Sequence, residues 1–387
     1  MNHRFLNCLL IAFLLISCVD PNDPALFSTV NTLVVDGLIT NLNEPQLVRL
    51  NQSKADPLTG RFGTIPVRQA IVEVIVDSVQ VISFHETEAG RYQAPNDFVG
   101  QTGHRYQLRF TLQDGRTYAS TTEVMQPVPA IDKVYAQFNP KSLPPAEALK
   151  GGYAAAHDFY VDWQDPAGQV NYYRWDWIDW ERQEWCQSCR GGLYQIADEQ
   201  GNLIEDCVNY KFTYPYYDYN CRTPCWEIIR SVGLNLFSDQ LSNGKFQQGR
   251  RVAQVPVYSK EHCLVEIRQA SLTSAAYAYI KKLSDQTQNT GGVADTPASI
   301  PVGNVLNRNA PNELVVGYFS ASAVSSVRFW LNRADATGFA PGLYEAFNDG
   351  RTPITEPSSS GRYRPPLAVC VPGDSRTPIK PDGWRDK

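Results

Sequence analysis

The chain has 387 residues, of which 43% are hydrophobic and 19% charged, with 26 Gly and 26 Pro, and this composition excludes disordered, collagen-like and coiled-coil proteins. The formal net charge is −5 and no dense Lys/Arg face is evident, which excludes nucleic acid as a partner. At about 100 to 200 residues per domain, the length predicts two or three globular domains.

Residues 1–17 have the pattern of a signal peptide. One positive charge, Arg4, precedes an uncharged apolar run, Phe5 to Ile16, that is too short to span a bilayer. The run ends in Leu15-Ile16-Ser17-Cys18, and an apolar residue, a small residue and then Cys is typical of a bacterial lipoprotein cleavage site. We expect Cys18 to carry lipid, because acyl chains contribute about 0.8 kcal/mol per buried CH2 and hold a protein at a membrane without a spanning helix. An ordinary secretory signal with a coincidental Cys is the alternative.

Residues 18–30 are expected to form an extended tether between the lipid and the folded part. The segment is polar, acidic and interrupted by Pro21 and Pro24. Asp20 and Asp23 also resemble the export signal of Bacteroidota surface lipoproteins. The sequence therefore predicts an outer-membrane, lipid-anchored protein at the cell surface.

Residues 31–126 are predicted to form an antiparallel β-sandwich. Residues 106 to 112 alternate Tyr, Leu, Phe and Leu with polar residues, as a half-buried strand does, and Asp114-Gly115 then turns the chain. The run Ile71 to Val76 followed by Gly90-Arg91-Tyr92 resembles small immunoglobulin-like or transthyretin-like modules. Short β-rich runs separated by turn residues are Thr32–Leu38, Gln46–Leu50, Ala70–Val76, Val79–Phe84, His104–Leu112 and Thr117–Val124. Residues 126–130 form the predicted linker, since two prolines end strand pairing.

Residues 131–387 are predicted to form a second β-rich domain of the same mainly β, sandwich-like class. Phe159–Trp163 and Tyr172–Trp180 are expected to pair as a hairpin across a turn at Asp165–Gly168. An insertion without secondary structure is expected at about 186–224. Further strands are expected at Cys263–Ile267, Glu313–Ser320 and Val327–Leu331, and one helix at Ala275–Gln288, capped by Ser274 and stopped by Gly291-Gly292.

Aromatic residues concentrate in one part of the second domain. Of the 44 Phe, Tyr and Trp residues, 18 lie between Tyr153 and Trp226. The rings on the strand after Tyr172 are too close together for a thin sandwich to bury both faces, so we expect the insertion to cover one face or a glycan or peptide to bind there. The predicted ligand- or partner-binding residues are Trp175, Trp177, Trp180, Trp185 and Tyr216.

Cysteines cluster in and after the insertion. Candidates for disulfides, which suit an exported protein, are Cys186, Cys189, Cys207, Cys221, Cys225 and Cys370. The two close pairs in the insertion leave a tetrahedral zinc site or a redox CxxC as alternatives, and the pairing cannot be read from the sequence. Cys263 lies in an apolar alternating run and is the predicted buried free thiol.

Catalytic motifs are absent from the sequence. There is no GxSxG, HExxH, GxGxxG or P-loop. We therefore expect a protein that is not an enzyme, with no metal and no cofactor. A glycosidase that uses two carboxylates beside an aromatic cleft remains the enzymatic alternative. Its candidate acids are Asp176, Asp179, Glu181 and Glu184.

The second half of the chain contains a series of segments in a recognisable order: Cys225-Trp226, Val252–Ser259, Glu266–Thr273, Ala276–Tyr279, Pro297-Ala298, Gly303–Val305 and Val316–Ser322. In these segments the chain resembles the Bacteroidota outer-membrane lipoproteins grouped as domain of unknown function 4249. The tail from Pro365-Pro366 to Trp384 looks like the C-terminal signature of that family, although relatives often place a second Cys soon after Cys370, and that departure leaves Cys370 to pair elsewhere or stay free.

That family has no established activity, so the resemblance implies a location and a partner rather than a reaction. Its members look like lipoproteins encoded beside TonB-dependent transporters. The resemblance therefore implies an accessory subunit that helps such a transporter to capture or gate its ligand. A structural or adhesive surface protein without a small ligand is the alternative.

Overall fold

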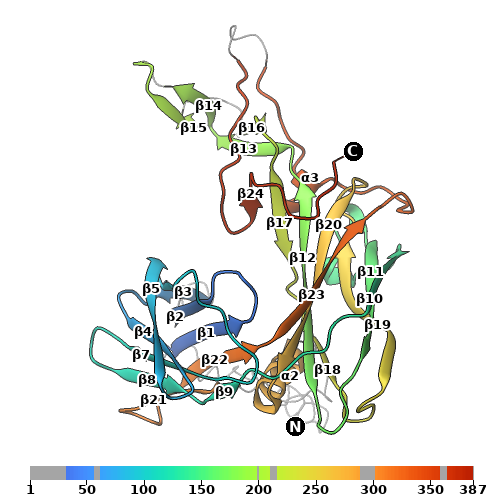
Figure 1. Cartoon of the computed structure of the whole chain (residues 1–387). Coiled ribbons are helices and arrows are strands. Elements are labelled where there is room, and N and C mark those ends of the chain that lie inside the picture. The colour runs from blue at the N-terminus through green and yellow to red at the C-terminus, as the bar shows by residue number, and fades with distance from the viewer. Residues whose placement is uncertain are drawn as a thin grey trace, which may run out of the picture.

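The computed structural model describes residues 32–55, 62–197, 200–209, 216–287, 301–357 and 364–386. The predicted signal peptide, Cys18 and the tether lie outside these residues. The described chain is mainly β, with several sheets and short helices (Figure 1). Among the described residues, no helix is both long and apolar enough to cross a membrane.

The first unit is a single 11-stranded sheet that encloses one apolar core. All six runs predicted for residues 31–126 contain strands, and β3 and β6 are additional. Its strands are β1 (Thr32–Thr40), β2 (Leu47–Ala55), β3 (Phe62–Pro66), β4 (Ile71–Val76), β5 (Gln80–Glu88), β6 (Arg91–Gln93), β7 (Arg105–Thr111), β8 (Thr117–Ser120), β9 (Glu123–Val124), β21 (Val305–Asn307) and β22 (Val315–Ser322). Alternate residues of β7 are buried, as the sequence pattern predicts.

Two strands of the first unit come from late in the sequence. β22 pairs in parallel with β1, and β21 pairs with β8. The backbones approach closely here, since a Cβ on Gly317, whose φ is +102°, would lie 1.8 Å from the carbonyl oxygen of Val35. The sheet therefore joins residues from both sides of the predicted linker. β22 is separated from the next strand, β23, only by the buried Ala323.

The second unit is a sandwich of a three-stranded and a six-stranded sheet. The small sheet contains β10 (Lys133–Asn139), β11 (Ala156–Gln164) and β19 (Phe246–Pro256), and the large one contains β12 (Tyr172–Arg182), β17 (Trp226–Arg230), β18 (Asn235–Ser238), β20 (Cys263–Leu272), β23 (Val324–Leu331) and β24 (Arg376–Thr377). The predicted hairpin between residues 159–163 and 172–180 is wrong, because β11 and β12 belong to opposite sheets. Their side chains meet face to face in the core.

The helices differ from the prediction in two respects. α2 (Ser274–Thr287) lies where the helix was expected, but the Thr273 hydroxyl, not Ser274, accepts a hydrogen bond from the Ala276 amide at 3.2 Å. The predicted stop at Gly291-Gly292 lies outside the described residues. A second, five-residue helix, α3 (Leu343–Phe347), was not predicted. Single 3-10 turns occur at Pro145–Glu147 and Lys150–Gly152.

The insertion contains strands and projects beyond the end of β12 (Figure 1), so it neither lacks secondary structure nor folds back over the aromatic strand. We call it the extension. β13 (Trp185–Arg190) pairs with β16 (Tyr216–Asn220), and β14 (Gly192–Ala197) pairs with β15 (Leu203–Asn209). Two disulfides, Cys186–Cys221 and Cys189–Cys207, lie within the extension, and a third joins Cys225 to Cys370.

All six predicted cysteines are thus in disulfides, and Cys263 is the buried free thiol that the sequence indicated. No bond forms within either close pair. Cys186 bonds to Cys221, Cys189 bonds to Cys207, and Cys225 bonds to Cys370. The four sulfurs of the zinc alternative are therefore all used in disulfides. Cys370, left open by the sequence, anchors the C-terminal tail.

Candidate functional site

The strand β12 directs its aromatic side chains to both faces of the large sheet. Trp175 points into the sandwich, where it is 1% exposed and its ring lies 5.3 Å from that of Trp163. Its indole nitrogen donates to Gln269 at 3.1 Å. Trp175 was predicted to contact a ligand or partner. Because the small sheet covers its ring, no ring surface is left for such a contact.

Three other predicted binding residues have partners within the chain. Trp177 is half-buried and packs against Ile229 and Tyr258. Trp180 lies on the opposite face of β12, with the Arg328 guanidinium 5.3 Å from its ring. The Arg351 guanidinium lies over the ring of Tyr216, 4.5 Å from the ring centroid. The fifth predicted residue, Trp185, lines a cleft.

This cleft has a volume of about 640 Å³ and lies between the end of the second unit and the base of the extension. Its aromatic lining comes from four separate segments: Trp185 from β13, Trp330 from β23, Tyr344 from α3 and Trp384 from the C-terminal tail. The three indoles are half-buried. The volume is within the range of about 300 to 1,000 Å³ that is usual for ligand sites.

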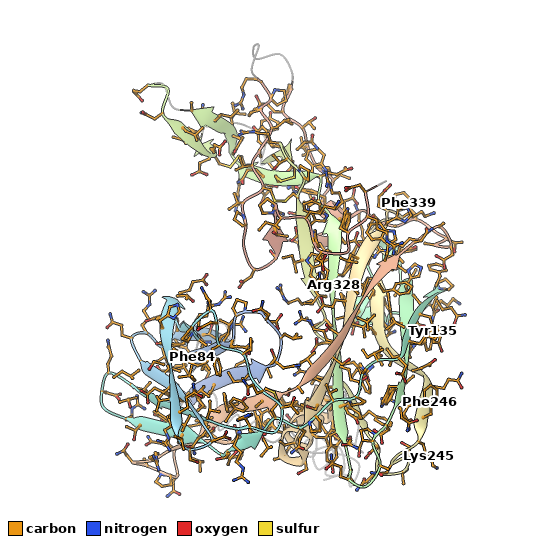
Figure 2. The ribbon with its side chains drawn as sticks, in the orientation of Figure 1. Phe84, Tyr135, Lys245, Phe246, Arg328 and Phe339 are labelled. Carbon is orange, nitrogen blue, oxygen red and sulfur yellow. A yellow bond between two sulfur atoms is a disulfide. The ribbon has the colours of Figure 1, made fainter. Side chains whose placement is uncertain are left out.

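The C-terminal tail forms one wall of the cleft. The ring of Trp384 lies edge-on to Trp330 at 5.0 Å and to Trp226 at 5.7 Å. Arg328, which Figure 2 labels on β23, donates to the backbone oxygen of Asp382 at 2.7 Å. The tail is therefore fixed by edge-on ring contacts and by a charged donor, in addition to the Cys225–Cys370 disulfide upstream.

A buried carboxylate fixes a second part of the cleft lining. Asp218 is 2% exposed and accepts hydrogen bonds from the hydroxyl groups of Tyr344 and Ser188, both at 2.6 Å, and from Arg351. The ring of Trp185 lies edge-on to Tyr344 at 5.8 Å. The Asp218 network therefore ties α3 to the extension and sets the position of two aromatic rings of the cleft.

Both signs of charge line the cleft. Arg182 and Arg385 are the cations, and Glu184, Glu261, Glu345 and Asp386 are the acids. Lys150 pairs with Glu345 at 2.9 Å, and Lys380 pairs with Asp386 at 2.5 Å. His262, stacked on Trp330 at 5.7 Å, adds an imidazole.

The acids predicted for a glycosidase do not gather in this cleft. Asp179 and Glu181 lie inside the second unit beside Arg333, which is itself 0% exposed, and Glu181 accepts from Arg333 at 2.6 Å. Burial and the charge of Glu181 raise the pKa of Asp179 well above its usual value, and burial likewise raises the pKa of the nearby Cys263 thiol. Asp176 pairs with Arg174, so only Glu184 of the four lines the cleft.

Sequence reasoning missed Trp330, Tyr344 and Trp384. All three lie outside the aromatic-rich segment, and the disulfide that places the tail spans 145 residues. The one available signal was the position of Trp384 within the tail motif. A search for isolated Trp residues near the C-terminus would have found it, but not its neighbours in space.

A model of one protein family matches this chain over residues 19–328 and is described as a domain of unknown function (DUF4249). The match covers most of the 387 residues and ends before Trp330, Tyr344 and Trp384. No curated protein matches the chain. The chain therefore belongs to the DUF4249 family.

Proposed function

We propose that this protein is a lipid-anchored accessory subunit of the outer membrane that captures a ligand in the aromatic cleft for a TonB-dependent transporter. It has no enzymatic activity of its own in this proposal. Cys18 carries the lipid, and residues 18–30 connect it to the folded units. The observation that carries the proposal is the cleft lined by Trp185, Trp330 and Trp384.

The construction of the cleft supports a binding role. Soluble domains seldom leave several indoles accessible without a function, and aromatic residues dominate the binding free energy at recognition sites. The walls are held by the Asp218 network and by a disulfide, so little ordering is needed when a ligand binds.

The N-terminal pattern supports the proposed anchor. Residues 1–17 and Cys18 match a lipoprotein signal, and the partner follows from the resemblance to lipoproteins encoded beside transporters. A lipidated Cys18 would hold the protein at the membrane surface, where a transporter would receive its ligand.

The proposal is tested by affinity purification of the tagged protein from detergent-solubilised outer membrane of its host, with partners identified by mass spectrometry. We expect a TonB-dependent transporter in near-equal amount. The variant Cys18→Ser should leave the membrane fraction and lose the transporter, while Phe339→Ala, which removes an aromatic side chain that is 84% exposed, should behave as the wild type.

Recovery of the wild-type lipoprotein without a transporter would contradict the accessory role. A Cys18→Ser protein that remains in the membrane fraction would contradict the lipid anchor. Because the two outcomes are read separately, the anchor and the partner can fail independently.

A further inference from the structure

Two disulfides lie side by side where the extension joins the second unit. The sulfur atoms of Cys186, Cys221 and Cys225 all lie within 4.8 Å of one another. Cys186 is on β13, Cys221 directly follows β16, and Cys225 directly precedes β17 (Figure 1). Cys186 is bonded to Cys221, whereas Cys225 is bonded to Cys370 in the C-terminal tail. A thiolate released from the first disulfide would therefore lie beside a sulfur of the second.

The two disulfides differ in their access to solvent. Cys221 is half-buried. The other three cysteines are more deeply buried, since Cys186 is 4%, Cys225 0% and Cys370 7% exposed. A thiolate must reach a disulfide sulfur in order to attack it. An external thiol should consequently attack first at Cys221, and it should reach the disulfide of the tail much more slowly.

A positive charge lies close to Cys186. The Arg376 guanidinium donates a hydrogen bond to the backbone oxygen of Cys186 at 3.0 Å, and it also pairs with Glu227 at 3.1 Å. A guanidinium close to a cysteine favours the thiolate over the thiol, and the thiolate is the form that attacks a disulfide. This charge supports Cys186 as the group that attacks Cys225 once its own disulfide has opened.

We propose that these four cysteines relay reduction by an external dithiol from the surface of the extension to the C-terminal tail. One thiolate of the dithiol attacks the sulfur of Cys221, and Cys186 leaves as a thiolate. Cys186 then attacks the sulfur of Cys225, and Cys370 leaves as a thiolate that takes up a proton. The second thiolate of the dithiol attacks the dithiol sulfur that is bonded to Cys221, and Cys221 leaves and is protonated.

Bonds, electrons and protons balance in this relay. The dithiol is oxidised to a disulfide and loses two protons, and the chain gains two thiols, Cys221 and Cys370. The disulfides Cys186–Cys221 and Cys225–Cys370 are replaced by one, Cys186–Cys225. The chain is a substrate of this exchange, so the relay adds no catalytic activity.

The relay loosens one wall of the aromatic cleft. Cys370 is the covalent link of the tail that carries Trp384, and after the exchange that part of the tail is held by noncovalent contacts such as the one from Arg328 to Asp382. The exchange itself does not depend on the proposed function. Only its effect on ligand capture rests on that function.

The test is limited reduction of the lipidated full-length mature protein in detergent with one molar equivalent of dithiothreitol. The reaction is stopped with excess N-ethylmaleimide under denaturing conditions, and the cysteine peptides are mapped by mass spectrometry. We expect a Cys186–Cys225 disulfide together with alkylated Cys221 and Cys370. Cys263, which is a free thiol before the reduction, reports whether alkylation is complete.

Two double variants test the order of the steps. Cys186→Ser combined with Cys221→Ser removes the point of entry and should slow the release of Cys370 by about tenfold or more. Cys189→Ser combined with Cys207→Ser removes the other disulfide of the extension, which lies outside the group of three sulfurs. This second variant should release Cys370 as the wild type does.

The inference is overturned if alkylated Cys186 and Cys221 accumulate while the Cys225–Cys370 disulfide stays intact. Release of Cys370 at the wild-type rate without Cys186 and Cys221 would also overturn it, because the dithiol would then reach the tail disulfide directly. Unchanged amide hydrogen exchange at Trp384 after the relay would overturn the effect on the cleft. Co-purification of the transporter is measured on the oxidised protein, so a failed relay leaves the accessory role intact, and a missing transporter leaves the relay intact.

Discussion

The second unit and the extension reach a fixed structure by different physical means. Between the two sheets of the second unit, Trp163, Tyr173, Trp175 and Phe237 form one aromatic cluster, with ring centroids 5.3 to 6.3 Å apart. The extension consists of two-stranded ladders that are marginal alone, and two disulfides lie within it. Where facing sheets bury many large side chains, packing suffices, and where the buried cluster is small, as in the extension, covalent links supplement it.

The largest effect expected from a single substitution is on the interior of the second unit. Arg333→Ala leaves Glu181 and Asp179 without their cation in a site from which water is excluded. Removing one partner of such a buried pair lowers the free energy of unfolding by about 3 to 5 kcal/mol. Urea denaturation followed by tryptophan fluorescence measures this, and a change below 1 kcal/mol, roughly the value for a surface pair, would show that the cluster is not important for stability.

The disulfides should stabilise the extension and tail without supporting the sandwich. In the loop-entropy account, closing 145 residues between Cys225 and Cys370 is worth about 5 kcal/mol, and closing 18 between Cys189 and Cys207 about 3 kcal/mol. Serine at both positions of either pair should raise amide hydrogen exchange in its own segment while β11 and β20 stay protected. Equal loss of protection in β20 would contradict the division between the two regions.

The pH dependence of stability tests the buried carboxyl group. Because the pKa of folded Asp179 is raised above its unfolded value, the folded chain keeps this proton to higher pH than the unfolded chain. The contribution of Asp179 to the unfolding free energy is therefore complete below the pKa that this group has in the unfolded chain. It declines as the pH rises from that value to the pKa of the folded chain. In the Asp179→Asn variant, the decrease in unfolding free energy from about pH 5 to about pH 8 should be smaller than in the wild type. If the variant shows the same pH-dependent change in unfolding free energy as the wild type, a group other than Asp179 is responsible for it.

The smallest effect is expected at the surface. Lys281 and Asp285 form a helical pair at 2.9 Å in which both side chains are 52% exposed. Lys281→Ala should lower the unfolding free energy by at most about 0.5 kcal/mol. The same denaturation experiment provides the matched control for Arg333→Ala. A loss comparable to that of Arg333→Ala would mean that burial is not what separates the two pairs.

The sequence predicted local features well and spatial ones poorly. β-rich and alternating runs placed β1, β7, β12 and β20, because residue composition and alternation are properties of each strand alone. It could not predict that β11 and β12 separate into opposite sheets, or that β22 pairs with β1 across the chain. Cysteine spacing indicated disulfides and the free Cys263, but not the partner of Cys370.

The candidate site shows the same limit more sharply. Trp185 was predicted because it belongs to a dense aromatic segment, whereas Trp175, in the same segment, is core. Density of rings in the sequence does not distinguish the two faces of a strand. The cleft exists only because α3 and the tail are brought to the end of β23, which depends on Asp218 and a long-range disulfide.

The most direct test of the central claim is a cryo-electron microscopy structure of the tagged lipoprotein purified with its partners from the host outer membrane. The account predicts a TonB-dependent transporter in the complex, with the cleft of Trp185, Trp330 and Trp384 open toward its extracellular mouth. A cleft that faces away from the transporter, or one filled by a segment of the transporter itself, would contradict ligand capture at this site.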